Sequence, residues 1–219
     1  MKLALDHVFI LTEVGAPAAE KLLSVGMPES FGRVHKGQGT ANRRFEFSNG
    51  MLELVWVHDM QEARTGTGAR LRLAERASQL NDSACPFGII LCPLNENDNE
   101  LPFSGWSYQP DYFAPPMAFH IGDNSELPEE PLCIYAPFFS LSRNNDKNRS
   151  QSQTDFASIS HIKLSVACDA LSDQLLAANF ADALQIIASD EHLMELTFGH
   201  SRLGMRIDLR PDLPLIINW

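Results

Sequence analysis

Residues 43–57, RRFEFSNGMLELVWV, contain two strand-like segments joined by an Asn-Gly pair. Asn-Gly between segments of alternating polarity is the strongest short-range signal of a β-hairpin. Upstream of this hairpin, residues 3–11 and 31–37 have strand composition, and residues 16–26 have the pattern of a short helix. The first 57 residues therefore predict the element order β-α-β-β-β.

The C-terminal stretch predicts the same order, from strand and helix patterns at residues 160–167, 169–180, 183–189, 192–199 and 203–209. Two pairs of polar residues occupy matching points of the two stretches. His161 follows His7 by 154 positions, and Asp208 follows Glu53 by 155 positions. Internal repetition at this scale predicts a repeated structural module.

The middle of the chain is less regular. Residues 86–93, 117–123 and 131–139 are typical of strands, and residues 68–80 are typical of an amphipathic helix. Residues 140–158 are polar and nearly free of aliphatic side chains, as expected of a linker.

We therefore expect an α+β fold, in which repeated βαβββ modules form a curved mixed-sheet cup and an additional βαβββ unit follows at the C-terminus. The expected cup spans residues 1–139, with one module at 1–57 and a degenerate module at 86–139. The polar linker is expected at 140–158, and the C-terminal unit at 159–219.

Composition excludes several classes of partner. The formal net charge is −11, and an acidic surface repels phosphate backbones, so we expect no nucleic-acid partner. No run of about 18 apolar residues exists, so we expect no membrane span.

Asp6, His7 and Glu13 interrupt the N-terminal apolar stretch, which favours a first strand over a signal peptide. The four cysteines lack metal-ligand spacing and predict either reduced thiols in a cytoplasmic protein or one disulfide pair.

Three polar residues are predicted on apolar strand faces. Because side chains alternate along a strand, His7 shares a face with Phe9, and Glu53 shares one with Val55. Arg43 shares its face with Phe45 and Phe47, whereas Arg44, Glu46 and Ser48 occupy the opposite, solvated face. Burying three such groups unpaired would cost several kcal/mol, so they need partners. The partners could be one another, a metal ion, or a small anion bound by the Arg43 guanidinium.

Residues 35–43, HKGQGTANR, form the most distinctive polar stretch. Gln38, Thr40 and Asn42 offer donors and acceptors to a substrate, and His35 could act as a general acid or base. A polar turn between two strands is the alternative interpretation. The stretch lacks the P-loop pattern GxxxxGK[ST].

The first-strand histidine in LDHVFI, the glutamate in LELVWV and the β-α-β-β-β order resemble the vicinal oxygen chelate superfamily, which includes glyoxalase I and extradiol dioxygenases. More narrowly, residues 35–57 resemble glyoxalase-like proteins of unassigned activity. The resemblance covers residues 3–57 well, and residues 86–137 and 159–211 more weakly. It implies a cup made of two modules and allows a homodimer.

The resemblance also implies metal ligands on the first and last strands of both modules. If the first and third units pair, the ligands would be His7, Glu53, His161 and Asp208. However, His161 shares its face with Lys163, and Asp208 lies between charged neighbours, a pattern typical of a solvated salt-bridge ladder. If the first and middle units pair, the positions that match His7 and Glu53 are Gly88 and a residue near Ile134 or Tyr135, none of which is a ligand.

These expectations converge on a glyoxalase-like enzyme that acts on a small polar or anionic molecule. A divalent metal (Zn, Fe, Mn or Ni) would activate the substrate, with His35 and Glu53 as catalytic residues and Gln38, Thr40, Asn42 and Arg43 as substrate contacts. The first alternative is a metal-free, non-catalytic small-molecule-binding protein of the same fold. The second alternative is a structural role in dimerisation for the C-terminal unit.

Overall fold

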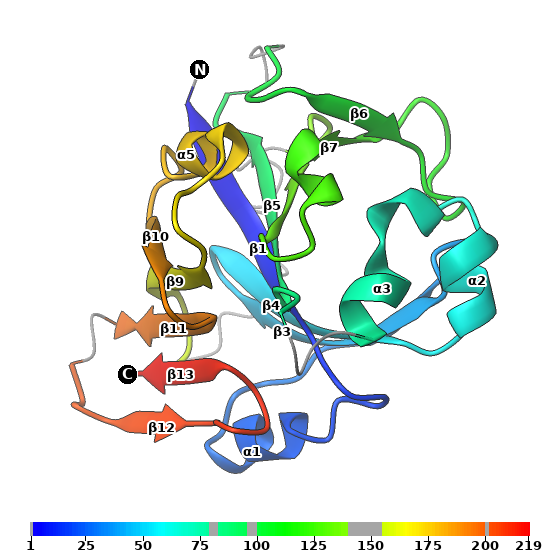
Figure 1. The fold of residues 1–219 in the computed structure, drawn as a ribbon. Helices are drawn as coiled ribbons and strands as arrows, with labels where there is room; N and C mark the ends of the chain where they lie inside the picture. The colour runs from blue at the N-terminus through cyan, green and yellow to red at the C-terminus, as the bar shows by residue number, and fades with distance from the viewer. Residues whose placement is uncertain (1, 79–82, 96–99, 140–154, 200–201) are drawn as a thin grey trace.

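The computed structural model describes residues 2–78, 83–95, 100–139, 155–199 and 202–219. Strands predominate, and every helix is short (Figure 1). The elements of the first part are β1 (Leu3–Leu11), α1 (Ala19–Ser24), β2 (Arg33–His35), β3 (Thr40–Phe47), β4 (Gly50–Val57), α2 (Met60–Thr65), η1 (Ala69–Leu71), α3 (Leu73–Ser78), β5 (Phe87–Pro93), β6 (Gly105–Tyr108), β7 (Phe119–Gly122), η2 (Asp123–Glu126) and β8 (Leu132–Tyr135). Those of the second part are β9 (Ile159–Ala167), α5 (Asp173–Ala178), β10 (Leu184–Ser189), β11 (Leu193–Phe198), β12 (Arg206–Asp208) and β13 (Leu215–Asn218).

The first eight strands form one mixed sheet in the order β2-β3-β4-β1-β5-β8-β7-β6. Its two halves have matching pairings. β1 is parallel to β4, and β5 is parallel to β8, while β3 and β7 are antiparallel to β4 and β8 respectively. β1 and β5 pair antiparallel at the centre and join the two halves.

The last five strands form a second mixed sheet in the order β10-β9-β11-β13-β12. Here the first strand, β9, pairs parallel with β10 and antiparallel with β11. In the first half of the large sheet, by contrast, the first strand pairs with the last strand, β4. The C-terminal unit therefore has the predicted order of elements up to β12 but a different pairing, and the repeated βαβββ module is not confirmed. The α+β class with mixed sheets is confirmed.

The central strands of the large sheet, β3, β4, β1, β5 and β8, present one face to the main core and one to a cavity. Val8 and Ile10 of β1 and Leu54 of β4 belong to a large buried cluster together with residues of the second sheet, such as Ile162 and Leu196. We call this the outer face of the large sheet. The opposite face, here called the cavity face, carries a separate buried cluster that includes Phe9, Val55 and Ile134.

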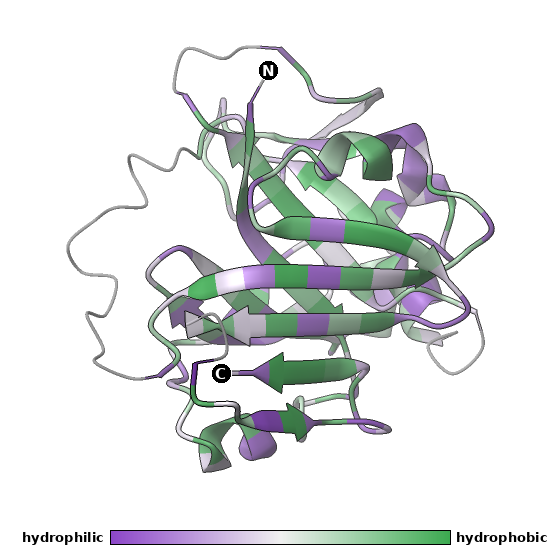
Figure 2. Cartoon of the chain, turned by 90° about the vertical axis from the view of Figure 1, so that its left-hand side faces the viewer, coloured by the Kyte–Doolittle hydropathy of each residue, from purple (hydrophilic) through white to green (hydrophobic). Residues whose placement is uncertain are grey.

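The second sheet packs on the outer face, and its strands alternate in polarity. Along β9, β10 and β11 buried residues are interspersed with partly or fully exposed ones, and Figure 2 shows apolar and polar positions following one another along these strands. Asn49, at the β3–β4 turn, donates from its side chain to the Ile159 carbonyl at 2.7 Å and accepts from the Ile159 N–H at 2.8 Å. The two sheets thus share one core, and their division into separately folding domains stays a prediction.

The structure also bears on the expectations about membrane spans, cysteines and the linker. In the described part of the chain no helix has the length and apolar character needed to cross a bilayer. Cys85, Cys92, Cys133 and Cys168 are free thiols. Most of the predicted linker, residues 140–154, lies outside the described residues.

Candidate functional site

A cavity of about 370 Å³ opens on the cavity face of the large sheet. Both halves of the sheet contribute to it, together with Leu71 of η1 and Leu73 of α3. Most of the lining is aromatic or aliphatic. The polar lining residues are Asp6, His7, Arg33, His35, Gln38, Arg44, Glu46 and Glu53.

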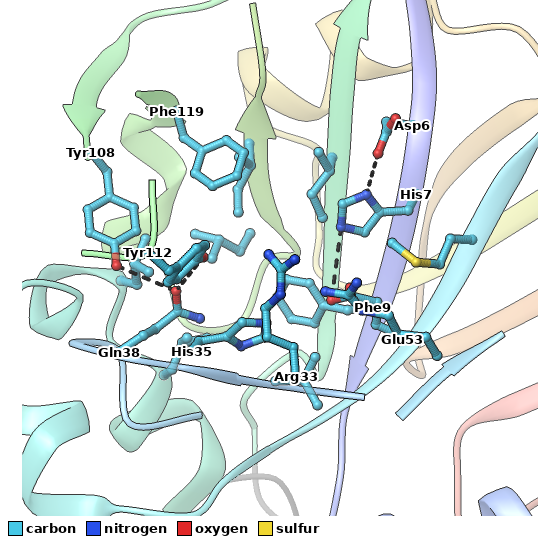
Figure 3. A pocket seen from close by; sticks show the side chains of 18 of the residues that line it. Asp6, His7, Phe9, Arg33, His35, Gln38, Glu53, Tyr108, Tyr112 and Phe119 are labelled. Atoms are coloured by element: carbon cyan, nitrogen blue, oxygen red, sulfur yellow. Dashed lines mark hydrogen bonds and ion pairs between the residues drawn. The ribbon is translucent and has the colours of Figure 1, made fainter. Parts of the chain in front are cut away.

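An irregularity in β1 brings two adjacent polar residues into this cavity. The pairing of β1 with β5 shifts between Leu5 and His7, so Asp6 and His7 both line the cavity. His7 Nδ1 lies 2.6 Å from Asp6 Oδ2, and His7 Nε2 lies 4.0 Å from Glu53 Oε2 (Figure 3). Burial alone would lower the pKa of His7, but the hydrogen bond to Asp6 and the charge of Glu53 outweigh burial and raise it.

Glu53 is held by an arginine on the neighbouring strand. Arg44 on β3 and Glu53 on β4 are directly paired, and Arg44 Nε lies 3.0 Å from Glu53 Oε1. The two side chains are only 11% and 8% exposed. The Arg44 guanidinium also lies 5.1 Å from the centre of the Phe31 ring, within the range of a cation–π contact. The expectation that Arg44 and Glu46 are solvated is therefore wrong for Arg44, and both residues line the cavity.

The polar stretch 35–43 forms another part of the lining. His35 and Gln38 line the cavity, whereas the buried Thr40 and Asn42 are absent from its lining and hold these two side chains. Thr40 Oγ1 lies 2.9 Å from His35 Nδ1 and accepts a hydrogen bond from Gln38 Nε2 at 3.0 Å. Asn42 Nδ2 lies 3.5 Å from His35 Nε2. Burial lowers the pKa of His35 to about 4, so its ring is neutral at pH 7.

Two tyrosines from the second half of the sheet reach the same polar group. The hydroxyls of Tyr108 and Tyr112 donate to Gln38 Oε1 at 3.5 and 3.3 Å (Figure 3). Burial raises the pKa of Tyr108 to about 12, so its hydroxyl stays protonated and remains a donor. These contacts connect the first half of the sheet to β6 and to the segment between β6 and β7.

Aromatic rings from that segment form one wall of the cavity. Phe113 lies 5.0 Å from Tyr112 and 5.2 Å from Phe119, measured between ring centres. Phe9 of β1 also lines the cavity. Rings at these separations give the cavity an apolar, well-packed wall.

Arg33 on the edge strand β2 points its guanidinium into the cavity (Figure 3). Its backbone N–H donates to Asn42 Oδ1 at 2.7 Å, which fixes the strand locally. The guanidinium lies 6.0 Å from the centre of the Tyr112 ring. Among the ion pairs of the described residues, none involves Arg33. The cavity therefore contains a cation that is available to a ligand.

Arg43, the expected anion contact, is not part of the cavity lining. Its Nε and Nη2 donate to the two carboxylate oxygens of Glu29 at 2.6 Å each, and its Nη1 donates to Glu20 of α1 at 2.8 Å. Arg43 is adjacent to Arg44, so strand alternation sends its side chain to the other side of the sheet. Its role is to attach β3 to α1.

His161 and Asp208, the other two expected metal ligands, are exposed on the second sheet and absent from the cavity lining. Asp208 Oδ2 accepts a hydrogen bond from Arg210 Nη2 at 2.7 Å, and this contact holds the pKa of Asp208 down at about 2. Lys163, on the same face as His161, pairs with Glu195 at 3.1 Å. The structure thus places these residues among surface ion pairs, away from His7 and Glu53.

The residues present do not fit a divalent metal. His7 and Glu53 supply two donors, and the Arg44 guanidinium already occupies one side of the Glu53 carboxylate. In the second half of the sheet, the positions expected to match His7 and Glu53 are Gly88 on β5 and Ile134 on β8. Gly88 pairs with Leu132, two residues before Ile134, and neither Gly88 nor Ile134 has a side chain that could bind a metal. A Cβ on Gly88 would meet the Phe9 ring at 2.0 Å, so Phe9 fills the space of any side chain there. Across the described ranges, no cluster of three or more His, Cys, Asp or Glu side chains could hold a metal ion.

Sequence reasoning missed Arg33, Arg44 and the aromatic wall. Arg33 and His35 alternate on a three-residue edge strand, which is too short for a reliable periodic signal. Tyr112 and Phe113 lie between strands, in an aromatic, proline-rich segment, WSYQPDYFAPP, that has no periodic pattern to indicate which way its side chains point.

Comparisons with known proteins inform the fold alone. The sequence matches no protein family model and no curated protein. Among solved structures, a hypothetical protein from Staphylococcus aureus is similar over 99% of both chains, with a TM-score of 0.62 and 13% sequence identity. A hypothetical protein from Bacillus halodurans aligns with 64% of this chain and 96% of its own, with a TM-score of 0.38 and 13% identity. The first similarity shows that the arrangement of both sheets occurs in another protein.

Proposed function

We propose that this chain is a glyoxalase-like cup, of the vicinal oxygen chelate type, that binds a small organic acid without a metal ion. The acid would lie on the cavity face of the large sheet, with its charged group at Arg33 and its apolar part against the aromatic wall.

The matching pairings of the two sheet halves support the proposed relationship to that superfamily. β1 and β4 with their neighbours β3 and β2 correspond to β5 and β8 with their neighbours β7 and β6. We propose that these halves are two copies of one ancestral module. The second copy has no helix between β5 and β6 among the residues described there. The C-terminal sheet would then be an addition that covers the outer face.

The observation that carries the proposed function is the guanidinium of Arg33, an exposed residue of β2 that lines a largely apolar cavity and makes no ion pair with a carboxylate of the described residues. A guanidinium binds a carboxylate through two parallel hydrogen bonds. The neighbouring Arg44 is already neutralised by Glu53. A ligand carboxylate would give Arg33 the ion-pair partner that no described residue supplies.

The other lining residues would shape the ligand's position. Gln38 and the two tyrosine hydroxyls offer polar contacts at the edge of the cavity, while Phe9, Phe113 and Phe119 exclude water from the apolar part of the ligand. The contacts of His35 with Thr40 and Asn42 fix its ring, so we propose that His35 is a wall residue rather than a general acid or base.

A metal-dependent enzyme is the competing proposal, and it retains the His7–Glu53 pair as its basis. That pair provides only two donors, beside a guanidinium, and would hold a divalent ion weakly.

Calorimetric titration with matched ligands tests the proposed function. 3-Phenylpropionate carries a carboxylate and a ring, and 3-phenylpropionamide has the same shape without the charge. We expect the acid to bind at least about tenfold more tightly than the amide, since a hydrogen bond to a charged group contributes roughly 1.5–3 kcal/mol.

Two arginine variants identify the residue that binds the carboxylate. Arg33→Gln should reduce the affinity for the acid to that for the amide, whereas Arg206→Gln, which removes an exposed arginine on β12, should leave it unchanged. Equal affinities of the wild-type protein for acid and amide would refute the proposal.

A further inference from the structure

We propose that His7 and Glu53 together recognise a hydroxyl group of the bound acid, so that the natural ligand belongs to the class of hydroxylated carboxylic acids with an apolar body. This inference rests on the proposed function, because it concerns a second polar contact of the same ligand. It assigns a specificity-determining role to two residues that are not needed to bind the carboxylate.

The orientation of His7 is fixed from one side. Its Nδ1 lies 2.6 Å from Asp6 Oδ2, which directs Nε2 toward Glu53 (Figure 3). Asp6 is buried, so this contact is shielded from water. The ring is therefore held with one nitrogen committed to the protein and the other directed at the cavity side of β4.

Glu53 is fixed in the same way. Its Oε1 faces Arg44 Nε at 3.0 Å, and its Oε2 faces His7 Nε2 at 4.0 Å. A separation of 4.0 Å is too long for a direct hydrogen bond between the two residues. Both side chains are about nine-tenths buried, with 11% of His7 and 8% of Glu53 exposed.

A gap of this size suits one oxygen atom that both donates and accepts. An oxygen placed to one side of the His7–Glu53 line can lie about 2.8 Å from each atom, since two such distances together exceed the 4.0 Å separation. Glu53 Oε2 accepts from that oxygen, and His7 Nε2–H donates to it. A carboxylate lies on each side of the His7 ring, Asp6 at Nδ1 and Glu53 at Nε2, and this arrangement favours the ring form that carries a hydrogen on both nitrogens.

A hydroxyl group satisfies both contacts from a single atom, whereas an ether or a carbonyl oxygen can only accept. Apart from Asp6 and Arg44, which hold the pair, the lining of this strand face includes the apolar residues Phe9 and Met51. A ligand without a hydroxyl would leave the pair to a water molecule, and a hydroxylated ligand would replace that water. The pair therefore discriminates between acids that are otherwise alike.

The test compares three acids with the same ring and chain: 3-phenylpropionate, 3-phenyllactate and 3-(4-hydroxyphenyl)propionate. The last two carry the hydroxyl at different distances from the carboxylate. We expect at least one of them to bind the wild-type protein roughly tenfold more tightly than the parent acid. His7→Leu should make the affinities for that acid and the parent equal, and the matched control His161→Leu should preserve the difference.

Two results would overturn the inference. One is that neither hydroxylated acid binds the wild-type protein more tightly than 3-phenylpropionate, a comparison that needs no variant and holds even if His7→Leu does not fold. The other is a hydroxyl preference that persists in folded His7→Leu. If the acids are still preferred over 3-phenylpropionamide, only this inference fails, whereas loss of that preference refutes the proposed function itself.

Discussion

Gly88 determines how the Phe9 ring lies in the cavity, and its replacement by alanine is a sharp test of the structure. Gly88 on β5 is directly paired with Phe9 on β1. A Cβ atom at this position would lie 2.0 Å from Phe9 Cε1 and 2.2 Å from Cζ, far inside van der Waals contact. In Gly88→Ala the ring must therefore rotate, and the open space beside it is the ligand cavity.

The cost to stability should be moderate, because the displaced atoms are the end of a side chain that borders open space. Overpacking a core costs about 1–3 kcal/mol, and we expect the lower part of this range, about 1–2 kcal/mol, for Gly88→Ala. The effect on binding should be larger, since the ring would enter the volume that we propose for the ligand. We expect the affinity for 3-phenylpropionate to fall at least about tenfold.

Urea unfolding and calorimetric titration of the same samples measure the two effects. Gly50→Ala is the matched control, because its Cβ would lie 3.4 Å from Ile159 Cδ1, an ordinary contact. This control should change the free energy of unfolding by less than about 1 kcal/mol and leave binding unchanged. A folded Gly88→Ala protein with wild-type affinity would refute the placement of the ligand beside Phe9.

Three further predictions concern other residues of the cavity and its surroundings. The folded-state pKa of His35 is about 4, below its ordinary 6.5, so the unfolded chain takes up the proton first and stability falls as the pH drops from 6.5 toward 4. Relative to His35→Gln, wild-type protein should lose about 2 kcal/mol of unfolding free energy between pH 8 and pH 5, and parallel pH profiles from urea denaturation would contradict this. Glu53→Leu should lower the free energy of unfolding by about 3–5 kcal/mol, because it leaves Arg44 buried without its partner. The double variant Glu53→Leu/Arg44→Met should recover most of that loss in the same urea assay. No recovery would contradict the pairing of Arg44 with Glu53. Arg43→Ala should lower the free energy of unfolding by about 1 kcal/mol and leave the affinity for 3-phenylpropionate within twofold of wild type. A large loss of affinity would show that Arg43 belongs to the binding site.

The hairpin at the start of the fold could be predicted because local chemistry determines it. The Asn-Gly turn joins β3 and β4 in a register that pairs Phe47 with Gly50, and Glu53 and Val55 share the cavity face as alternation predicts. These features depend on neighbouring residues in the sequence. The same local signals predicted the α+β class.

The choice between Arg43 and Arg44 could not be made from the sequence. Both faces of β3 are covered, the outer face by the main core and the cavity face by the site, so an apolar neighbour does not indicate which face binds a ligand. Phe45 and Phe47 belong to the main core, and Arg43, on their face, pairs with Glu29 at its edge. Tertiary packing decides this choice.

Two other features depend on contacts between distant segments. The irregularity that turns both Asp6 and His7 toward the cavity arises where β1 pairs with β5, more than 80 residues away. The matching order of elements in the C-terminal unit suggested a third module, but strand order in a sheet depends on which edges meet, and β9 pairs with β10 and β11. His161 and Asp208 were attractive only under the wrong pairing.

The most direct test of the account is a calorimetric titration of 3-phenylpropionate into protein treated with EDTA and then dialysed. We predict binding with the same affinity before and after this treatment, and no change when zinc, iron, manganese or nickel is added back. Binding that disappears with EDTA and returns with one of these metals would contradict the metal-free, arginine-based site.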